Sequence, residues 1–325
     1  MDLAGNSDPT LASLLAHYLR IRILTGATVA RYDLVVRNLT RFIGGATAAP
    51  SDIALNRVTP DVMLDFRAWS LKRMRPVSFN TERRHLSVLF NAAVQEGWML
   101  SNPLRKVQGA PVTQLLPKAL PRDSMQAYME WLRTSKALNK RGMEVDLIQP
   151  QWFWLIVLRT LYYTGMRKRQ LLGMVWEDID FVDKTIKMAA TSSKTRREWL
   201  VPLPDQLLPD LLTLRSRTQE LYKGQMDRKQ VFCLPLFSER RTTFRHATMR
   251  PDNLDNFFQR LRRAMPVDAP RLSAHRVRHT TSTILANNVP NLKVVQEQLG
   301  HASINTTYLY VHPDMQAMRK ALATL

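Results

Sequence analysis

Six side chains have the types needed to act together on a phosphodiester. An arginine presents a planar, permanently charged fork that matches two phosphate oxygens, so two arginines can neutralise the charge that grows in a five-coordinate transition state. A tyrosine hydroxyl titrates near ~10 and needs a base or cationic surroundings to attack, and a lysine can protonate the departing sugar oxygen. The six candidates are Arg167, Lys194, His275, Arg278, His301 and Tyr310.

The spacing of these residues predicts where they lie. His275 and Arg278 are three residues apart, which places them on one face of a helix. Arg167 follows Gly165, a residue that can end the apolar helix before it, so Arg167 is expected at the start of the next helix. Tyr310 lies nine residues after His301, and the nearby Tyr308 is a second candidate for the nucleophile.

Other catalytic signatures are missing from the sequence. It contains no P-loop, no GxGxxG and no HExxH. His275 and His279 have the spacing of two metal ligands, but no third ligand accompanies them, and the arginines between them would repel a cation. Cys233 is the single cysteine, which excludes a cysteine-rich metal site. We therefore expect neither a metal ion nor a nucleotide cofactor.

The charge balance predicts a polyanionic partner. The chain has 325 residues, with 47 Lys and Arg against 27 Asp and Glu, a formal charge of +20. Residues 1–110 hold 14 basic and 8 acidic residues, and residues 111–325 hold 33 and 19. Neutralising phosphates releases their condensed counterions, so a surplus in both parts favours a long phosphate backbone. A membrane surface is disfavoured because it usually recruits one basic helix or tail. A soluble protein that is merely basic is the simpler alternative.

The elements that must position these residues are mostly helical. Length and pattern predict a bundle of four helices in residues 1–103, a proline-containing linker over 104–120, and a second domain over 121–325. The second domain is expected to be mainly helical with one small antiparallel sheet. Its predicted strands are 178–181, 185–189 and 198–201, and its predicted helices are 122–135, 151–164, 167–174, 205–221, 252–265, 275–287, 290–299 and 313–323.

Two features bear on the cellular compartment. The apolar stretch 151–163 is short and carries Arg159, so we expect a buried helix and no membrane span. No charged and then apolar leader opens the sequence, which argues against export. The cytoplasm is therefore the expected location.

The sequence resembles the tyrosine recombinases of the phage integrase family over residues 10–325. The segment SFNTERRHLS at 78–87, running on to Asn102-Pro103, resembles the last helix of the family's core-binding domain. LYYTGMRKRQLLGMVWEDID at 161–180 resembles the first catalytic box. LSAHRVRHTTSTIL at 272–285 and LGHASINTTYLYVHP at 299–313 resemble the second. HxxRH followed by LGH and TTxxYxH, in this order, is a specific signature.

The resemblance implies a role for each of the six residues in a DNA recombinase. Arg167 and Arg278 would clamp the scissile phosphate, and Lys194, in preference to Lys187 or Lys184, would protonate the departing 5′-oxygen. His275 would assist proton transfer, His301 would donate a hydrogen bond to a non-bridging oxygen, and Tyr310 would form a 3′-phosphotyrosine. Gln170 stands where the family usually has glutamate, so a contact near Arg167 is expected to differ.

The resemblance also implies partners. These are double-stranded DNA with paired recombination sites and three further copies of the chain, docked through the C-terminal helix. About ten residues precede the first predicted helix, so no arm-binding domain is expected. The DNA contacts expected in the bundle are Lys72, Arg73, Arg75, Arg83 and Arg84.

Two alternatives share the fold or the chemistry. One is a non-catalytic DNA-binding protein, and the other is an activity like that of a type IB topoisomerase.

Overall fold

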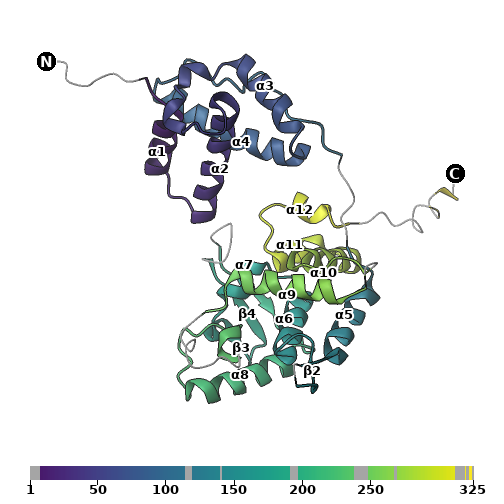
Figure 1. The fold of residues 1–325 in the computed structure, drawn as a ribbon. Coiled ribbons are helices and arrows are strands. Elements are labelled where there is room, and N and C mark those ends of the chain that lie inside the picture. The colour runs from purple at the N-terminus through teal and green to yellow at the C-terminus, as the bar shows by residue number, and fades with distance from the viewer. Residues whose placement is uncertain are drawn as a thin grey trace. The chain divides into compact units, whose positions relative to one another are not determined.

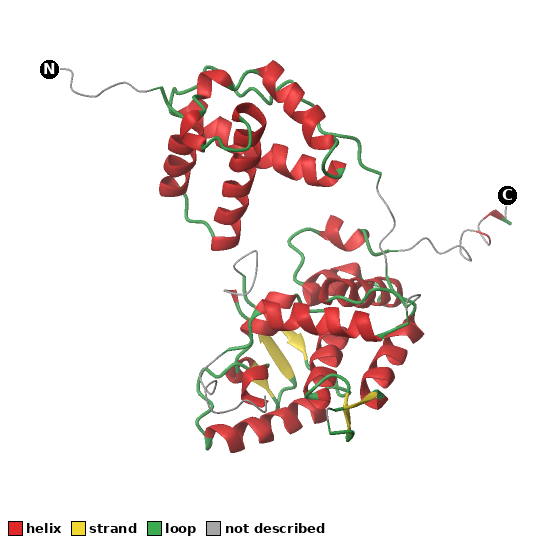
Figure 2. Ribbon diagram, in the orientation of Figure 1, coloured by secondary structure: helices red, strands yellow, loops and turns green. Residues whose placement is uncertain are grey.

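The computed structural model divides the chain into two compact units, Met1–Leu115 and Leu116–Leu325, called here the N-terminal unit and the C-terminal unit. Helices dominate both units, as Figure 2 shows, which confirms the mainly α class. The structure describes residues 8–113, 119–139, 141–190, 197–237, 248–266, 269–311, 319 and 322–323. Lys194 and all but three residues of the predicted helix 313–323 lie outside these ranges.

Four helices form the N-terminal unit, as the sequence predicts. Threonine side chains at positions 10, 25 and 59 cap the first three by accepting a hydrogen bond from a backbone N–H of the first turn. Pro60 and Pro76 occupy the first helical position of the third and fourth, where no N–H is needed. The helices are α1 (Leu11–Ile21), α2 (Gly26–Gly44), α3 (Pro60–Leu71) and α4 (Pro76–Gln95).

The core of this unit is apolar and closed. Leu14, Leu39 and Phe90 have no solvent-exposed surface. Leu104 and Val107, which follow α4, are each 1% exposed and belong to the same cluster. The first residues of the predicted linker thus pack on the bundle.

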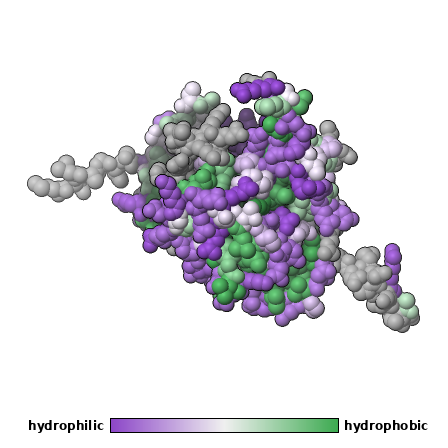
Figure 3. Space-filling view, turned by 90° about the horizontal axis from the view of Figure 1, so that it is seen from below, coloured by the Kyte–Doolittle hydropathy of each residue, from purple (hydrophilic) through white to green (hydrophobic). Residues whose placement is uncertain are grey.

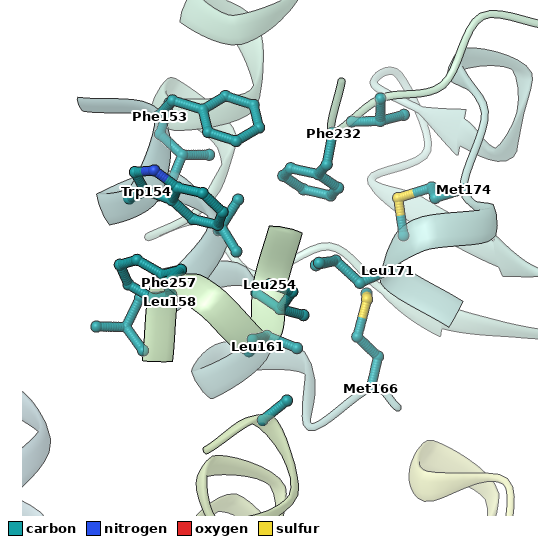
Figure 4. Close-up of a cluster of buried hydrophobic side chains, with 14 of the residues drawn as sticks. Phe153, Trp154, Leu158, Leu161, Met166, Leu171, Met174, Phe232, Leu254 and Phe257 are labelled. Atoms are coloured by element: carbon teal, nitrogen blue, oxygen red, sulfur yellow. The ribbon is translucent and has the colours of Figure 1, made fainter. Parts of the chain in front are cut away.

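The C-terminal unit is built around α6 (Gln151–Thr164), which packs against α5, α8 and α10. Figure 4 shows Phe153, Trp154, Leu158 and Leu161 of this helix among the buried side chains of the core. Within the unit α10 and α11 lie side by side, with α12 next to them (Figure 1). The other helices are α5 (Arg122–Thr134), α7 (Lys168–Gly173), α8 (Leu208–Tyr222), α9 (Pro251–Ala264), α10 (Ala274–Asn288), α11 (Leu292–Leu299) and α12 (Ile304–Tyr308).

Among the described residues, two small antiparallel sheets accompany these helices, where the sequence predicted one. The predicted sheet is present in the order β3-β4-β5, with Met188 opposite Trp199. Its first strand is shorter than expected because residues 176–178 form a 3₁₀ turn, closed by Asp178 accepting from the Val175 N–H. The second sheet, β1 with β2, was not predicted. The strands are β1 (Lys136–Leu138), β2 (Glu144–Asp146), β3 (Ile179–Asp180), β4 (Thr185–Met188) and β5 (Trp199–Pro202).

Hydrophilic residues cover much of the surface visible in Figure 3, with smaller hydrophobic areas between them. Within the described part of the chain, every helix is too short or too polar to cross a lipid bilayer.

Candidate active site

The junction of α6 and α7 positions Arg167. Gly165 ends α6 in the left-handed conformation, with φ +63°, and its N–H donates to the Leu161 carbonyl at 3.0 Å. Met166 and Leu171 are buried on either side of Arg167 (Figure 4) and fix the backbone there. Arg167 is the residue before α7, the place that the sequence predicted, and its side chain is half-buried.

Helix α10 carries Arg278 into the interior. Ser273 caps the helix by accepting from the Arg276 N–H. Arg278 is only 4% exposed, and its Nη1 donates to the Gly165 carbonyl at 2.6 Å. Its Nη2 lies 2.7 Å from the Leu299 carbonyl. The guanidinium is therefore locked against the end of α6 and the end of α11.

Both arginines bind the turn that ends α11. Gly300 ends this helix with φ +60°, again the left-handed conformation. Arg167 Nη1 donates to the Leu299 carbonyl at 3.3 Å, and both of its terminal nitrogens reach the Gly300 carbonyl at 3.3–3.4 Å. Because Arg278 shares the Leu299 carbonyl, the two guanidinium groups lie side by side.

His301 follows this turn and is held in one tautomer. Arg278 can only donate, so the contact of its Nη2 with His301 Nε2 at 2.9 Å makes Nε2 the acceptor. The proton then resides on Nδ1, which donates to Thr307 Oγ1 at 2.9 Å. Burial lowers the pKa of His301 to about 4, and the positive charges of Arg278 and Arg167 act in the same direction. The imidazole of the free protein is neutral.

Tyr310 completes this cluster from the segment after α12. The residue is 7% exposed, and its ring packs between His279, at 5.1 Å between centroids, and His301, at 5.9 Å. The His301 ring beside it is in turn contacted by Arg278. Burial lowers the pKa of Arg167 and of Arg278, and the Tyr310 phenol opposes this shift only in part. Tyr308, in contrast, is 57% exposed and lines a pocket with Lys293 on the α11–α12 surface.

His275 lies at the exposed rim and pairs with His279. Their Nε2 atoms are 2.8 Å apart and their rings are perpendicular, at 89°. Burial and the neighbouring Arg278 lower the pKa of each imidazole. The sequence reasoning considered His279 only as a metal ligand and missed this contact. The i, i+4 spacing on one helix was the signal that could have revealed it.

The arginine pair, Arg167 and Arg278, lacks a carboxylate partner in the part of the chain that the structure describes. Its acceptors are backbone carbonyls and one neutral imidazole. Burial and the adjacent Arg167 together lower the pKa of Arg278 to about 9. A buried and a half-buried cation without a carboxylate partner among the described residues form a site that is organised in advance to accept an anion.

Family models match both units of the chain. The model of the phage integrase family matches residues 118–317, and the model of its SAM-like domain matches residues 10–109. The chain belongs to the phage integrase family. The predicted resemblance to tyrosine recombinases is thereby confirmed.

Individual proteins of the integrase family are similar to this chain at low sequence identity. A putative tyrosine recombinase XerC of Pseudomonas syringae is 28% identical over 316 residues, covering 96% of this chain and 63% of that protein. A protein of the same name from Pseudomonas aeruginosa is 28% identical over 249 residues, covering 75% of this chain and 56% of that protein. The chain therefore spans about three fifths of the length of these relatives.

Solved integrase structures share the fold. The Tn1549 transposon integrase in complex with transposon right end DNA matches with a TM-score of 0.71 at 17% identity, covering 98% of this chain and 99% of that chain. A lambda integrase dimer bound to a COC′ core site matches with a TM-score of 0.66 at 21% identity, covering 95% and 97%.

Two integrase-family positions flagged by the sequence have defined surroundings. Gln170 is buried at 2% exposure, and its Oε1 accepts from the Arg167 N–H at 2.7 Å, so it caps α7 through the backbone of Arg167. The two alternative lysines are paired with acids: Lys184 with Asp205 at 2.7 Å and Lys187 with Asp178 at 3.5 Å. Lys194 lies outside the described residues.

The basic residues predicted to contact DNA fall into two groups. Lys72, Arg73, Arg75 and Arg84 are exposed between the end of α3 and the first half of α4, and the Arg73 guanidinium stacks on Trp69. Arg83 differs, because it is half-buried and its Nε donates to the Val107 carbonyl at 2.6 Å. That contact ties α4 to the segment after it.

Within the described residues, histidine, cysteine, aspartate and glutamate side chains form no group of three that could hold a metal ion. His275 and His279 interact through a hydrogen bond and a perpendicular ring contact.

Proposed function

We propose that this chain is a site-specific DNA recombinase that cuts and rejoins strands through a 3′-phosphotyrosine, without metal or ATP. The observation that carries the proposal is the placement of Tyr310. Its buried ring stacks on His301, which Arg278 contacts at 2.9 Å, and the arginine pair has no carboxylate partner in the described structure. A scissile phosphate bound to Arg167 and Arg278 would lie next to the attacking oxygen.

The cleavage step uses six groups around one phosphorus atom. The Tyr310 oxygen attacks phosphorus, the bond to the 5′-oxygen breaks, and a phosphotyrosyl ester forms. Arg167 and Arg278 neutralise the non-bridging oxygens, and His301 adds a hydrogen bond to one of them. His275 takes the phenolic proton, and Lys194 protonates the 5′-oxygen as it leaves. The phosphotyrosyl ester keeps the free energy of the broken bond, so a second 5′-hydroxyl can reverse the reaction.

Lys194 is assigned as the acid because both alternatives have other partners. Lys184 and Lys187 are each held by an aspartate. Lys194 belongs to the connection between β4 and β5.

His301 must change its hydrogen bonding when phosphate binds. In the free protein its Nε2 accepts from Arg278 and cannot donate. A phosphate that takes over the Arg278 N–H groups releases Nε2, and its negative charge raises the pKa of the imidazole. Protonated His301 can then donate to a phosphate oxygen while Nδ1 still donates to Thr307. We infer that phosphate binding takes up a proton at this residue.

We further propose that the chain acts as a tetramer on paired recombination sites. A lambda integrase tetramer bound to a Holliday junction has the same fold, with a TM-score of 0.67. The C-terminal segment carries apolar residues at helical spacing, Met315, Met318, Ala321 and Leu322, which suit a docking helix. Light scattering of the chain with its DNA site tests this, and a mass of one or two copies throughout the reaction would contradict it.

A pool of randomised duplexes tests the activity whatever the sequence of the DNA site. The chain is incubated with the pool, in which each duplex is nicked on one strand. After cleavage the short fragment with the 5′-hydroxyl diffuses away, so the strand cannot be resealed and the covalent product is trapped. Adducts that survive detergent are collected and sequenced. We expect enrichment of an inverted-repeat sequence. Binding without adducts would favour the non-catalytic alternative, and adducts with supercoil relaxation but no sequence preference would favour the topoisomerase alternative.

A further inference from the structure

Trp199 lies against the same turn that both arginines bind. It is the first residue of β5 and pairs with Met188 of β4, and part of its indole packs on the core of the C-terminal unit. A Cβ placed on Gly300 would lie 2.2 Å from Cζ2 and 2.4 Å from Cη2 of this indole. The outer edge of the six-membered ring therefore rests directly on the Gly300 backbone.

This contact fixes the backbone on which the active site depends. The Leu299 and Gly300 carbonyls are the acceptors of the arginine pair, and His301 follows immediately. Gly300 can adopt its φ of +60° without strain, but nothing in a glycine prevents other conformations. Backbone hydrogen bonds to Gln296 and Glu297 hold the turn from the α11 side, and the indole packs on Gly300 as a rigid neighbour in addition.

The indole also carries a cost that a smaller aromatic ring would avoid. Its Nε1 is buried and has no hydrogen-bond partner among the residues that the structure describes. A buried N–H without an acceptor is destabilising, and phenylalanine at this position would avoid that cost. Phenylalanine would still fill the space near the strand, but its ring does not reach as far as Cζ2 and Cη2. The reach of the indole to Gly300 is therefore the feature that distinguishes tryptophan here.

We propose that Trp199 is a positioning residue of the active site, whose indole holds the Leu299–Gly300–His301 turn so that Arg167, Arg278 and His301 meet the phosphate in a fixed geometry. The inference rests on the proposed recombinase function. Trp199 touches neither phosphate nor nucleophile and acts only through the turn.

The first test compares two conservative substitutions in the full chain. Trp199→Phe shortens the ring at Gly300, and Trp152→Phe is the matched control, because Trp152 also packs partly on the core but at a distance from the turn. The rate of adduct formation is measured at saturating protein on the nicked duplex recovered by the selection above. We expect a loss of about 10–100-fold for Trp199→Phe, since misplacement by about 1 Å can cost 10²-fold. DNA affinity and Tm stay near those of the parent, and Trp152→Phe keeps the parent rate.

The second test asks whether the Trp199 indole limits the space for a side chain at Gly300. Gly300→Ala should nearly abolish adduct formation in the parent, because the new methyl group meets the indole. In the Trp199→Phe background the same change should cost less, because the contacts with Cζ2 and Cη2 are removed and only the strain of alanine at φ +60° is common to both backgrounds. Equal losses in the two backgrounds would overturn the proposal, and so would a Trp199→Phe protein as fast as the parent.

A third test separates the turn from the proton donor. A 5′-bridging phosphorothiolate has a sulfur leaving group that needs little protonation, so it should restore Lys194→Ala. It should not restore Trp199→Phe, because the reaction of this substrate still needs a correctly placed arginine pair, which the sulfur leaving group does not replace. Rescue of Trp199→Phe would show that the indole serves the proton donor and would refute the assigned role. If the parent chain forms no adduct with any duplex, the proposed recombinase function itself has failed, an outcome distinct from a failure of the role assigned to Trp199.

Discussion

Arg278 Nη2 lies 2.9 Å from His301 Nε2, so a buried cation and a neutral imidazole share one hydrogen bond in the free protein. The same nitrogen of Arg278 also donates to the Leu299 carbonyl. The arginine thus sets the tautomer of the histidine, and both groups are in place before any phosphate arrives.

Replacing Arg278 by lysine should uncouple this arrangement. Lysine offers a point charge on a flexible stem and cannot reach the Gly165 carbonyl, the Leu299 carbonyl and His301 with a rigid fork. We expect a loss of 10²-fold or more in adduct formation, about the effect of removing one oxyanion donor. Single-turnover gel assays measure it. Arg276→Lys on the same helix is the control, and an equal loss there would point to a general effect on α10.

The three histidines of the site make stability depend on pH. Burial lowers the pKa of His275, His279 and His301, the last to about 4. Between about pH 4 and the ordinary value near 6.5, the unfolded chain binds more protons than the folded one at His301, so stability rises with pH across this window. Acidification from pH 6.5 to 4.5 should lower the Tm, and His301→Gln should show a smaller decrease. Identical Tm profiles for the two proteins would contradict the burial of a neutral His301.

Thr307 should stabilise the tautomer of His301 that Arg278 sets. Its hydroxyl is the acceptor for Nδ1–H, and its side chain is fully buried. Thr307→Val leaves that N–H without an acceptor and should lower the free energy of unfolding by about 1–3 kcal/mol. Nitrogen chemical shifts of the imidazole should record the loss of the hydrogen bond from Nδ1–H. Thr307→Ser keeps the hydroxyl and serves as the control, so a shift of the same size in both variants would argue against this hydrogen bond.

The basic residues of the N-terminal unit should differ in their effects on DNA binding. Lys72, Arg75 and Arg84 are exposed. Where one of these side chains contacts a phosphate, its change to alanine should reduce the magnitude of the slope of log affinity against log salt concentration by about 1. Arg83→Ala should leave this slope unchanged and lower the Tm, because its guanidinium is engaged with backbone carbonyls. Fluorescence anisotropy over a salt series tests both statements. A reduced slope for Arg83→Ala would place that residue at the DNA.

Local sequence patterns predicted much of the fold. Helices α6 and α1 to α3 have apolar spacing together with a cap, a proline at the first position or a terminal glycine, and each signal acts within a few residues. The β1–β2 hairpin has strands of three residues and no alternation, and α12 is five residues long, so neither has a period to detect. The first turn of α4, which starts at Pro76, likewise carries no apolar stripe.

The site was predictable in its residue types but not in its contacts. Arg167, Arg278, His301 and Tyr310 are recognisable from motifs, whereas the shared acceptors at Leu299 and Gly300 depend on two helix ends meeting more than 130 residues apart. Backbone carbonyls carry no sequence signal. Trp199 likewise reads as an ordinary strand residue until its distance to Gly300 is known.

The proposed chemistry requires that Tyr310 joins the chain covalently to DNA. Trapped adducts of the parent protein are digested and the modified peptide is sequenced by mass spectrometry, in parallel with Tyr310→Phe and Tyr308→Phe. We expect a nucleotide on Tyr310, no adduct from Tyr310→Phe, and adducts from Tyr308→Phe. Adducts that persist in Tyr310→Phe and disappear in Tyr308→Phe would contradict the proposed mechanism.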